Sequence, residues 1–126
     1  MKEDLTYGTV NKKVLKTVAI MEKEYANPAL WEQLKATLDF NEKEFDQYFI
    51  ILFGMKAQEY LIRKRMKKAA ELFNQQLSIS QVYQACGYNN IPDFTRDFEK
   101  IYGITPFNFL MEKTKYTVKN GFFSKN

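Results

Sequence analysis

The sequence predicts an all-α protein with seven helices. Apolar residues recur at spacings of three and four along most of the 126 residues, which is the period of a helix with one buried face. No segment of any length alternates with the period of two that marks a strand. Asn, Gly and Pro interrupt the pattern at intervals, so the chain divides into several short helices and one long one.

The first two helices are predicted on either side of an Asn-Pro break. The first runs over 11–26 with Asn11 or Thr9 as its N-cap, and Asn27-Pro28 ends it. Its apolar positions are Val14, Leu15, Val18, Ile20, Met21 and Tyr25. A shorter helix is expected over 29–37, where leucine recurs every fourth residue.

The third helix is short and acidic at its start, and the fourth is the longest. Asn41 is the expected N-cap of the third, and Gly54 ends it. The next pattern continues without a break over 56–75. Its apolar side consists of Tyr60, Leu61, Met66, Ala69, Leu72 and Phe73.

The second half of the chain carries the clearest helix boundaries. Ser78 can cap a helix, and Gly87 lies where a tight turn requires a positive φ. Pro92 fits a first helical turn, Gly103 ends that helix, and Thr105-Pro106 caps and starts another. The expected helices lie near residues 80–85, 92–102 and 106–113. Two short helices joined by a tight turn are a common device for entering a DNA groove.

The composition is that of a packed domain and offers little for catalysis. Hydrophobic residues make up 45% of the chain and aromatic residues 16%. There is no histidine and one cysteine, so an internal disulfide is excluded and a zinc site or serine-type triad lacks its usual groups. Cys86 is predicted to be a small buried hydrophobe. We expect no catalytic residue, no metal and no cofactor, and therefore no enzyme.

The sequence gives no sign of a membrane or an export signal. No apolar run approaches the roughly 18 residues of a membrane span. The first ten residues lack the apolar core of a signal peptide. The expectation is a cytoplasmic protein with no membrane contact.

The net charge of +4 is unevenly distributed. Residues 54–77 hold six basic and two acidic residues, a local +4, and residues 104–126 add a local +3. Residues 42–53 instead sum to −2. Basic patches of this kind are compatible with DNA, whose backbone carries about one negative charge per 1.7 Å of helix axis.

Five motifs stand at fixed spacing in the second half of the chain. They are Ser78-Ile79, Val82-Tyr83, Gly87-Tyr88, Phe94-Thr95-Arg96-Asp97-Phe98-Glu99-Lys100 and Gly103-Ile104-Thr105-Pro106. Together they resemble the arabinose-operon-regulator (AraC/XylS) family of bacterial transcription factors, whose pattern is Ser-Ile-x-x-Ile-Ala, then Gly-Phe, Phe-x-Arg-x-Phe-Lys-Lys and Gly-x-Thr-Pro. Tyr83 replaces a usually small residue, and Glu99 replaces a usually basic one.

Residues 30–54 echo residues 78–103, which extends the resemblance to roughly 11–111. The parallel residues are Phe45 and Phe94, Phe49 and Phe98, and Gly54 and Gly103. The resemblance implies a single domain over 1–126 with two helix-turn-helix subdomains joined by a long bridging helix. Such a bridge would let two recognition helices enter successive major-groove segments. The expected parts are 11–54, the bridge 55–76, 77–113, and a tail 114–126 that is disordered or docks through Phe122 and Phe123.

The second recognition helix holds the best candidates for DNA contact. Arg96 is the preferred base reader, because arginine matches guanine with two hydrogen bonds. The alternative for Arg96 is a surface pair with Asp93 or Asp97. The set is completed by side chains suited to a thymine methyl (Ile91, Thr95), to base or phosphate (Asn89, Asn90) or to phosphate alone (Lys100, with Lys113 or Lys115 beyond it). Phe94, Phe98 and Tyr102 recur every fourth residue and are predicted to be core.

The first recognition helix, 42–52, presents acids where the family usually offers arginine. Its expected exposed residues are Glu42, Lys43, Glu44, Asp46 and Gln47, of which Lys43 and Gln47 are the candidate DNA contacts. Either the acids stabilise the helix N-terminus and face solvent, or this unit has lost base reading and serves as a scaffold or protein-contact face. The apolar run 50–53 is too long for one buried stripe, so part of it should meet the bridging helix or a partner.

The bridging helix carries charge on several of its faces. Its mostly solvated basic residues are Arg63, Lys64, Lys67 and Lys68, with Lys67 the chosen phosphate contact. Arg65 matches the family's bridge arginine, and we expect it to brace the junction by pairing with a carboxylate.

The expected function is that of a sequence-specific DNA-binding transcription regulator reading the major groove mainly through the second helix-turn-helix. Its partner is double-stranded DNA, and RNA polymerase or a sensory or dimerisation partner are further candidates. The alternative is a degenerate helix-turn-helix domain that acts through protein–protein contacts. The family normally joins this domain to a ligand-sensing or dimerising one, and the sequence leaves open whether the chain is stand-alone or a fragment.

Overall fold

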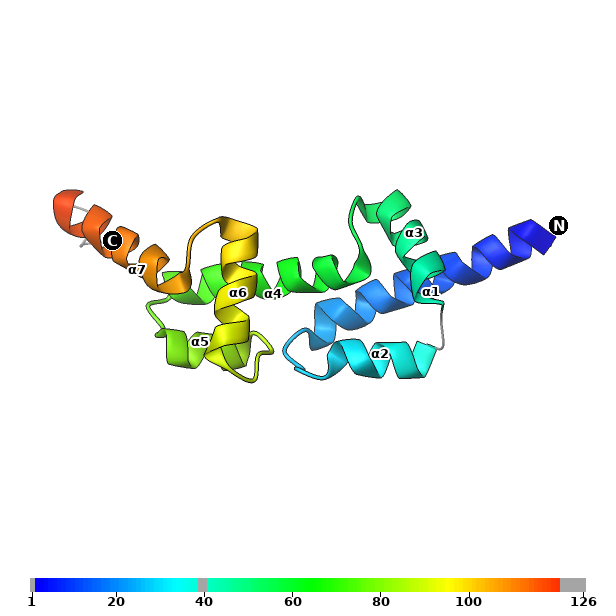
Figure 1. The fold of residues 1–126 in the computed structure, drawn as a ribbon, viewed down its shortest axis with the longest axis horizontal. Helices are drawn as coiled ribbons and strands as arrows, with labels where there is room; N and C mark the ends of the chain where they lie inside the picture. Colours follow the sequence, from blue (N-terminus) through cyan, green and yellow to red (C-terminus); the bar gives the residue numbers. More distant parts are fainter. Residues whose placement is uncertain (1, 39–40, 121–126) are drawn as a thin grey trace.

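The chain forms an elongated, all-α molecule in which one long helix lies at the centre (Figure 1). The computed structural model describes residues 2–38 and 41–120, and within them it has seven α-helices and no strand. The helices are α1 (Lys2–Glu24), α2 (Leu30–Leu38), α3 (Glu42–Phe53), α4 (Ala57–Asn74), α5 (Ile79–Ala85), α6 (Ile91–Tyr102) and α7 (Pro106–Asn120). The predicted fold class and number of helices are confirmed.

Apolar residues gather in two separate clusters, one at each end of α4. The first cluster joins α1, α2, α3 and the start of α4; its most deeply buried side chains are Val14, Met21, Phe45 and Phe49. The second joins the rest of α4 with α5 and α6; its most deeply buried side chains are Met66, Phe73, Val82, Phe94 and Phe98. We call these the first unit and the second unit. Because α4 supplies residues to both, it fixes the distance between them.

Two helices are longer than the sequence predicted. Helix α1 begins at Lys2, so Asn11 is an interior residue and neither it nor Thr9 is a cap. Helix α7 continues to Asn120, so residues 114–120 of the expected tail are helical. In both places the sequence lacks an obligatory stop, since an interior glycine such as Gly8 costs only about 1 kcal/mol. Phe122 and Phe123 lie outside the described residues.

Most predicted core residues are buried, with two corrections. Phe94, Phe98 and Cys86 are fully buried, as expected. Tyr102 is 41% exposed because it is the last residue of α6, although its ring still contacts Phe98 at 4.8 Å between centroids and its hydroxyl donates to the Met66 carbonyl at 3.0 Å. Leu15 is 59% exposed and lies off the buried stripe of α1.

Arg65 links the two units, although not by the predicted ion pair with a carboxylate. Its Nε donates to the carbonyl of Tyr25 and its Nη2 to the carbonyl of Asn27, both at 2.9 Å. Its guanidinium lies over the ring of Tyr88, 5.3 Å from the centroid. One buried side chain of α4 therefore holds the α1–α2 loop of the first unit against the turn of the second.

Gly87 lies at the same junction and makes the close approach possible. Its φ is +95°, and a Cβ there would lie 2.5 Å from the carbonyl oxygen of Tyr25. The predicted positive φ is confirmed, and the structure adds a second reason for glycine: the backbone of the first unit fills the space that a side chain would need.

Candidate nucleic-acid interface

The second helix-turn-helix, α5 and α6, is held by capping interactions at each boundary. Ser78 forms a capping box with Gln81, in which the serine oxygen accepts from the Gln81 backbone N–H at 3.3 Å. The tight turn passes through Gly87 and reaches Asn90, whose side chain caps α6 by accepting from the Asp93 N–H at 2.8 Å. Pro92 occupies the first turn. These local interactions fix where α6 begins and how it emerges from the turn.

Helix α6 packs one side into the second unit and leaves Arg96 on the other. The Arg96 side chain is 69% exposed. It also makes both of the surface pairs that the sequence allowed: Nη1 lies 3.2 Å from an Asp93 oxygen and Nε 3.4 Å from an Asp97 oxygen. The guanidinium is therefore accessible and at the same time held on its own helix.

The other candidates on this helix differ in how free they are to meet DNA. Asn89 and Lys100 are exposed, Ile91 opens α6 with an exposed side chain, and Thr95 is half-buried. The side chain of Asn90 is already occupied as the N-cap and also donates to Asp93 at 3.1 Å. Asn90 is thus a residue that shapes the helix start.

Tyr88 and Asp97 form a buried polar pair behind Arg96, which sequence reasoning missed. The Tyr88 hydroxyl donates to Asp97 Oδ2 at 2.7 Å, and both residues are less than 9% exposed. Burial and the hydrogen bond to Asp97 raise the pKa of Tyr88 far above its ordinary value. The sequence held one signal for this pair. Tyr88 replaces the family's Phe, and Asp97, nine residues later, occupies a position that the family pattern leaves open.

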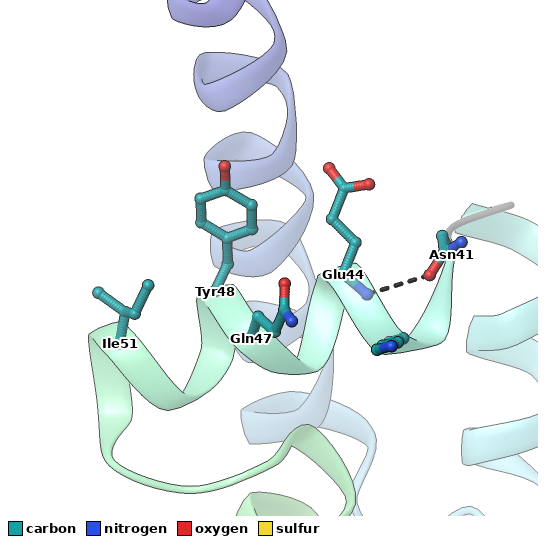
Figure 2. A pocket seen from close by; sticks show the side chains of 6 residues that line it. Asn41, Glu44, Gln47, Tyr48 and Ile51 are labelled. Carbon is teal, nitrogen blue, oxygen red and sulfur yellow. Dashed lines mark hydrogen bonds between the residues drawn. The ribbon is translucent and has the colours of Figure 1, made fainter.

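Helix α3 of the first unit is built on the same plan and carries a different surface. Asn41 caps it by accepting from the Glu44 N–H at 3.0 Å, and Gly54 ends it with φ +75°. Lys43 and Gln47 are exposed, as predicted. In Figure 2 the side chains of Glu44 and Tyr48 project from the same side of the helix. A shallow groove along this side is lined by Asn41, Lys43, Glu44, Gln47, Tyr48 and Ile51.

The end of α3 exposes apolar side chains. Ile51 is 68% exposed, and its neighbours Ile50 and Leu52 are also exposed. Only the last residue of this run, Phe53, turns inward, where its ring meets Tyr60 of α4 at 5.4 Å between centroids. The expectation that part of this run meets the bridging helix is therefore confirmed for Phe53.

Most basic residues on α4 have acidic partners. The pairs are Arg63 with Glu59 at 3.0 Å, Lys64 with Glu22 at 2.6 Å, and Lys68 with Glu71 at 4.0 Å. Lys67 is exposed and forms no ion pair within the part of the chain that the structure describes. Lys113 of α7 instead donates to the Phe73 carbonyl at 3.1 Å and to the Asn74 side chain at 2.6 Å, so its ammonium is hydrogen-bonded to the C-terminal end of α4.

The two recognition helices lie in corresponding places in the two units. Helix α3 packs against α1, and α6 packs against α4. Both run steeply across the long direction of the molecule, one in each half (Figure 1). Candidate residues on α3 and α6 therefore belong to separate surfaces that a straight, extended ligand could meet in succession.

Comparison with known proteins identifies this arrangement. Residues 34–112 match the model of a helix-turn-helix domain family; the match covers α3 to α6 in full and parts of α2 and α7. The chain belongs to the AraC-type helix-turn-helix family. It is therefore a DNA-binding domain of the kind found in transcription regulators, and its family is not a family of enzymes.

Relatives of this AraC-type domain include much longer regulators. The HTH-type transcriptional regulator GbdR of Pseudomonas aeruginosa is 25% identical over 100 residues, which are 79% of this chain and 27% of that protein. CdhR of the same species, another HTH-type transcriptional regulator, is 24% identical over 101 residues, 79% of this chain and 30% of that one. The chain thus spans less than a third of the length of the curated relatives it matches.

A solved structure has the same fold. The C-terminal domain of the two-component response regulator yesN from Fusobacterium nucleatum superposes with a TM-score of 0.63 and 30% identity. The match covers 75% of this chain and 99% of that one.

Within the residues the structure describes, no helix is both long and apolar enough to cross a membrane.

Proposed function

We propose that this AraC-type domain binds double-stranded DNA sequence-specifically and reads the major groove mainly through α6. The observation that carries the proposal is the contrast between the two recognition helices. Helix α6 presents an exposed arginine, and the one acid in its first turn, Asp93, pairs with that arginine; the first turn of α3 presents two acids, Glu42 and Glu44, and α3 has no arginine. Carboxylates aimed at DNA are repelled by its phosphates, so α6 is the better reader.

In this proposal each candidate has a defined role. Arg96 contacts guanine, and Ile91 and Thr95 contact a thymine methyl. Contacts to phosphate or sugar come from Asn89, Lys100 and Lys67, with Lys43 and Gln47 as the weaker contribution of the first unit. The domain divides functionally into residues 11–54, the bridge 55–76 and residues 77–113, so that DNA affinity is shared between the units and sequence preference is concentrated in the second.

A gel shift on mixed-sequence and selected duplexes tests this proposal. Binding should be detectable at about 50 mM salt and much weaker at about 200 mM, because phosphate contacts release counterions. Arg96→Ala should lower the preference for the selected site at a cost of roughly 1–3 kcal/mol. Arg63→Ala is the matched control, since it removes one exposed arginine that pairs with Glu59 and should not change preference. Uniform weakening by Arg96→Ala would remove it as a base reader.

A second candidate function is protein binding through α3. The observation in its favour is the exposed apolar run Ile50, Ile51 and Leu52 beside an acidic helix start, a surface suited to a partner with an apolar centre and a basic rim. RNA polymerase or a sensory or dimerisation partner would be of this kind. Failure to bind any duplex at about 50 mM salt would favour this function over DNA reading.

A further inference from the structure

We infer that Tyr88 and Asp97 are positioning residues for Arg96, and that they set how sharply this domain discriminates between base pairs. This inference rests on the proposed role of Arg96 as base reader. Long exposed side chains lose rotamer freedom when they bind, which weakens recognition unless the side chain is already ordered. The structure supplies such ordering from beneath the recognition helix.

Arg96 is held by two carboxylates, each of which is itself fixed. Asp93 accepts from Arg96 Nη1 at 3.2 Å and is tied to the helix start, where the Asn90 side chain donates to it at 3.1 Å. Asp97 accepts from Arg96 Nε at 3.4 Å and from the Tyr88 hydroxyl at 2.7 Å. Nη2 of Arg96 has no hydrogen bond within the described residues, so it remains available to a base.

Asp97 is suited to positioning because it is buried while Arg96 is not. It is 7% exposed, whereas the Arg96 side chain is 69% exposed. A carboxylate in such a site keeps its hydrogen bonds, because losing one leaves a buried charge without compensation. Its other oxygen is committed to Tyr88, so the oxygen facing Arg96 has one orientation.

Tyr88 is in turn anchored at the junction between the units. Its ring packs edge-on to Phe94 at 5.5 Å between centroids, and the Arg65 guanidinium lies over the Tyr88 ring, 5.3 Å from its centroid. Arg65 is bonded to the backbone of Tyr25. A continuous set of contacts therefore runs from the loop of the first unit through Tyr88 and Asp97 to the proposed base reader.

The test compares Tyr88→Phe and Asp97→Asn with Arg96→Ala on a duplex selected from a random pool and on its single-base-pair variants. Tyr88→Phe removes one hydroxyl and restores the family's residue, so it should fold normally, which thermal unfolding checks. We expect it to leave affinity for mixed-sequence DNA within about twofold and to lower discrimination at the Arg96-dependent base pair by roughly twofold to tenfold. Asp97→Asn should act in the same direction at the same base pair.

A double-mutant cycle separates positioning from a general structural role. In the Arg96→Ala background, Tyr88→Phe should produce no further loss of discrimination. If Arg96→Ala relaxes preference and Tyr88→Phe does not, positioning is disproved while the base-reading role stands. If Tyr88→Phe weakens all duplexes equally in both backgrounds, its role is structural and the inference is overturned. If Arg96→Ala itself changes no preference, the base-reading role fails and the inference fails with it.

Discussion

At the scale of single residues, the junction between the units depends on the absence of a side chain at Gly87. Its backbone adopts a φ of +95° and lies against the carbonyl of Tyr25. The sequence could predict the turn, because a glycine after a short helix is a local signal. It could not predict the neighbour, because Tyr25 is far away in the chain and no local pattern reports a contact of that range.

Gly87→Ala should destabilise the protein by more than the usual cost of a left-handed alanine. The new Cβ would meet the Tyr25 oxygen at 2.5 Å and Arg65 Nε at 3.0 Å, so the units must separate. Gly103→Ala is the matched control, since its φ is +72° and its Cβ would meet none of the described atoms within 4 Å. We expect the control to cost about 1–2 kcal/mol and Gly87→Ala clearly more in thermal or urea unfolding. Equal losses would show that the close contact is unimportant.

The same limit explains Arg65. Its burial beneath two backbone carbonyls 38 and 40 residues away cannot be read from the run of basic residues around it. The resemblance correctly marked it as a brace, and only the structure shows that carbonyls, and not a carboxylate, are its partners.

At the scale of helices, the sequence was informative wherever a helix had an explicit cap or stop. Helix α3 begins after Asn41 and ends at Gly54, as predicted. Helix α6 begins within one residue of Pro92 and ends at Gly103, close to the predicted residues. The ends of α1 and α7 were missed because polar and β-branched residues there neither require nor forbid a helix. The sequence also could not predict which apolar residues at the end of α3 are exposed, since periodicity alone does not say which of four consecutive apolar residues turns inward.

Neutralising the acidic start of α3 should strengthen DNA binding. Glu42→Gln with Glu44→Gln removes two negative charges from a helix that corresponds in position to α6. Affinity for mixed-sequence DNA should rise by roughly twofold to tenfold at low salt, while loss of the favourable dipole interaction costs about 0.3–1 kcal/mol of stability per residue. Fluorescence anisotropy and thermal unfolding measure the two effects.

Glu32→Gln is the matched control for this experiment. It also removes an acid from the first turn of a helix, but on α2. Affinity that stays unchanged in the α3 variant, or rises equally in the control, would mean that the start of α3 does not approach DNA.

At the scale of the whole molecule, two small cores share one helix and are fastened at one junction. Arg65 connects α4 to the α1–α2 loop and to the Tyr88 ring, so we expect it to restrict rotation of one unit against the other about α4. Under the proposed function α3 and α6 meet one duplex, and a fixed relative orientation would let both reach the groove at the same time.

Arg65→Lys should loosen this junction even though it keeps the charge. An ammonium cannot reproduce two directed bonds to the carbonyls of Tyr25 and Asn27 while lying over Tyr88. We expect a loss of about 1–3 kcal/mol in the free energy of unfolding. Arg63→Lys, on an exposed face of the same helix with a surface pair to Glu59, should change stability by less than about 0.5 kcal/mol. Similar values for the two variants would contradict the proposed brace.

The central claim is that DNA is read mainly through the second unit, and an NMR titration of the chain with a selected duplex tests it most directly. Backbone amide signals should shift most over residues 89–100, in the turn and most of α6, and less over 42–52 of α3. The Arg96 Nε–H signal should shift on the selected duplex and not on a mixed-sequence one. Shifts confined to α3, with α6 unaffected at low salt, would contradict the claim.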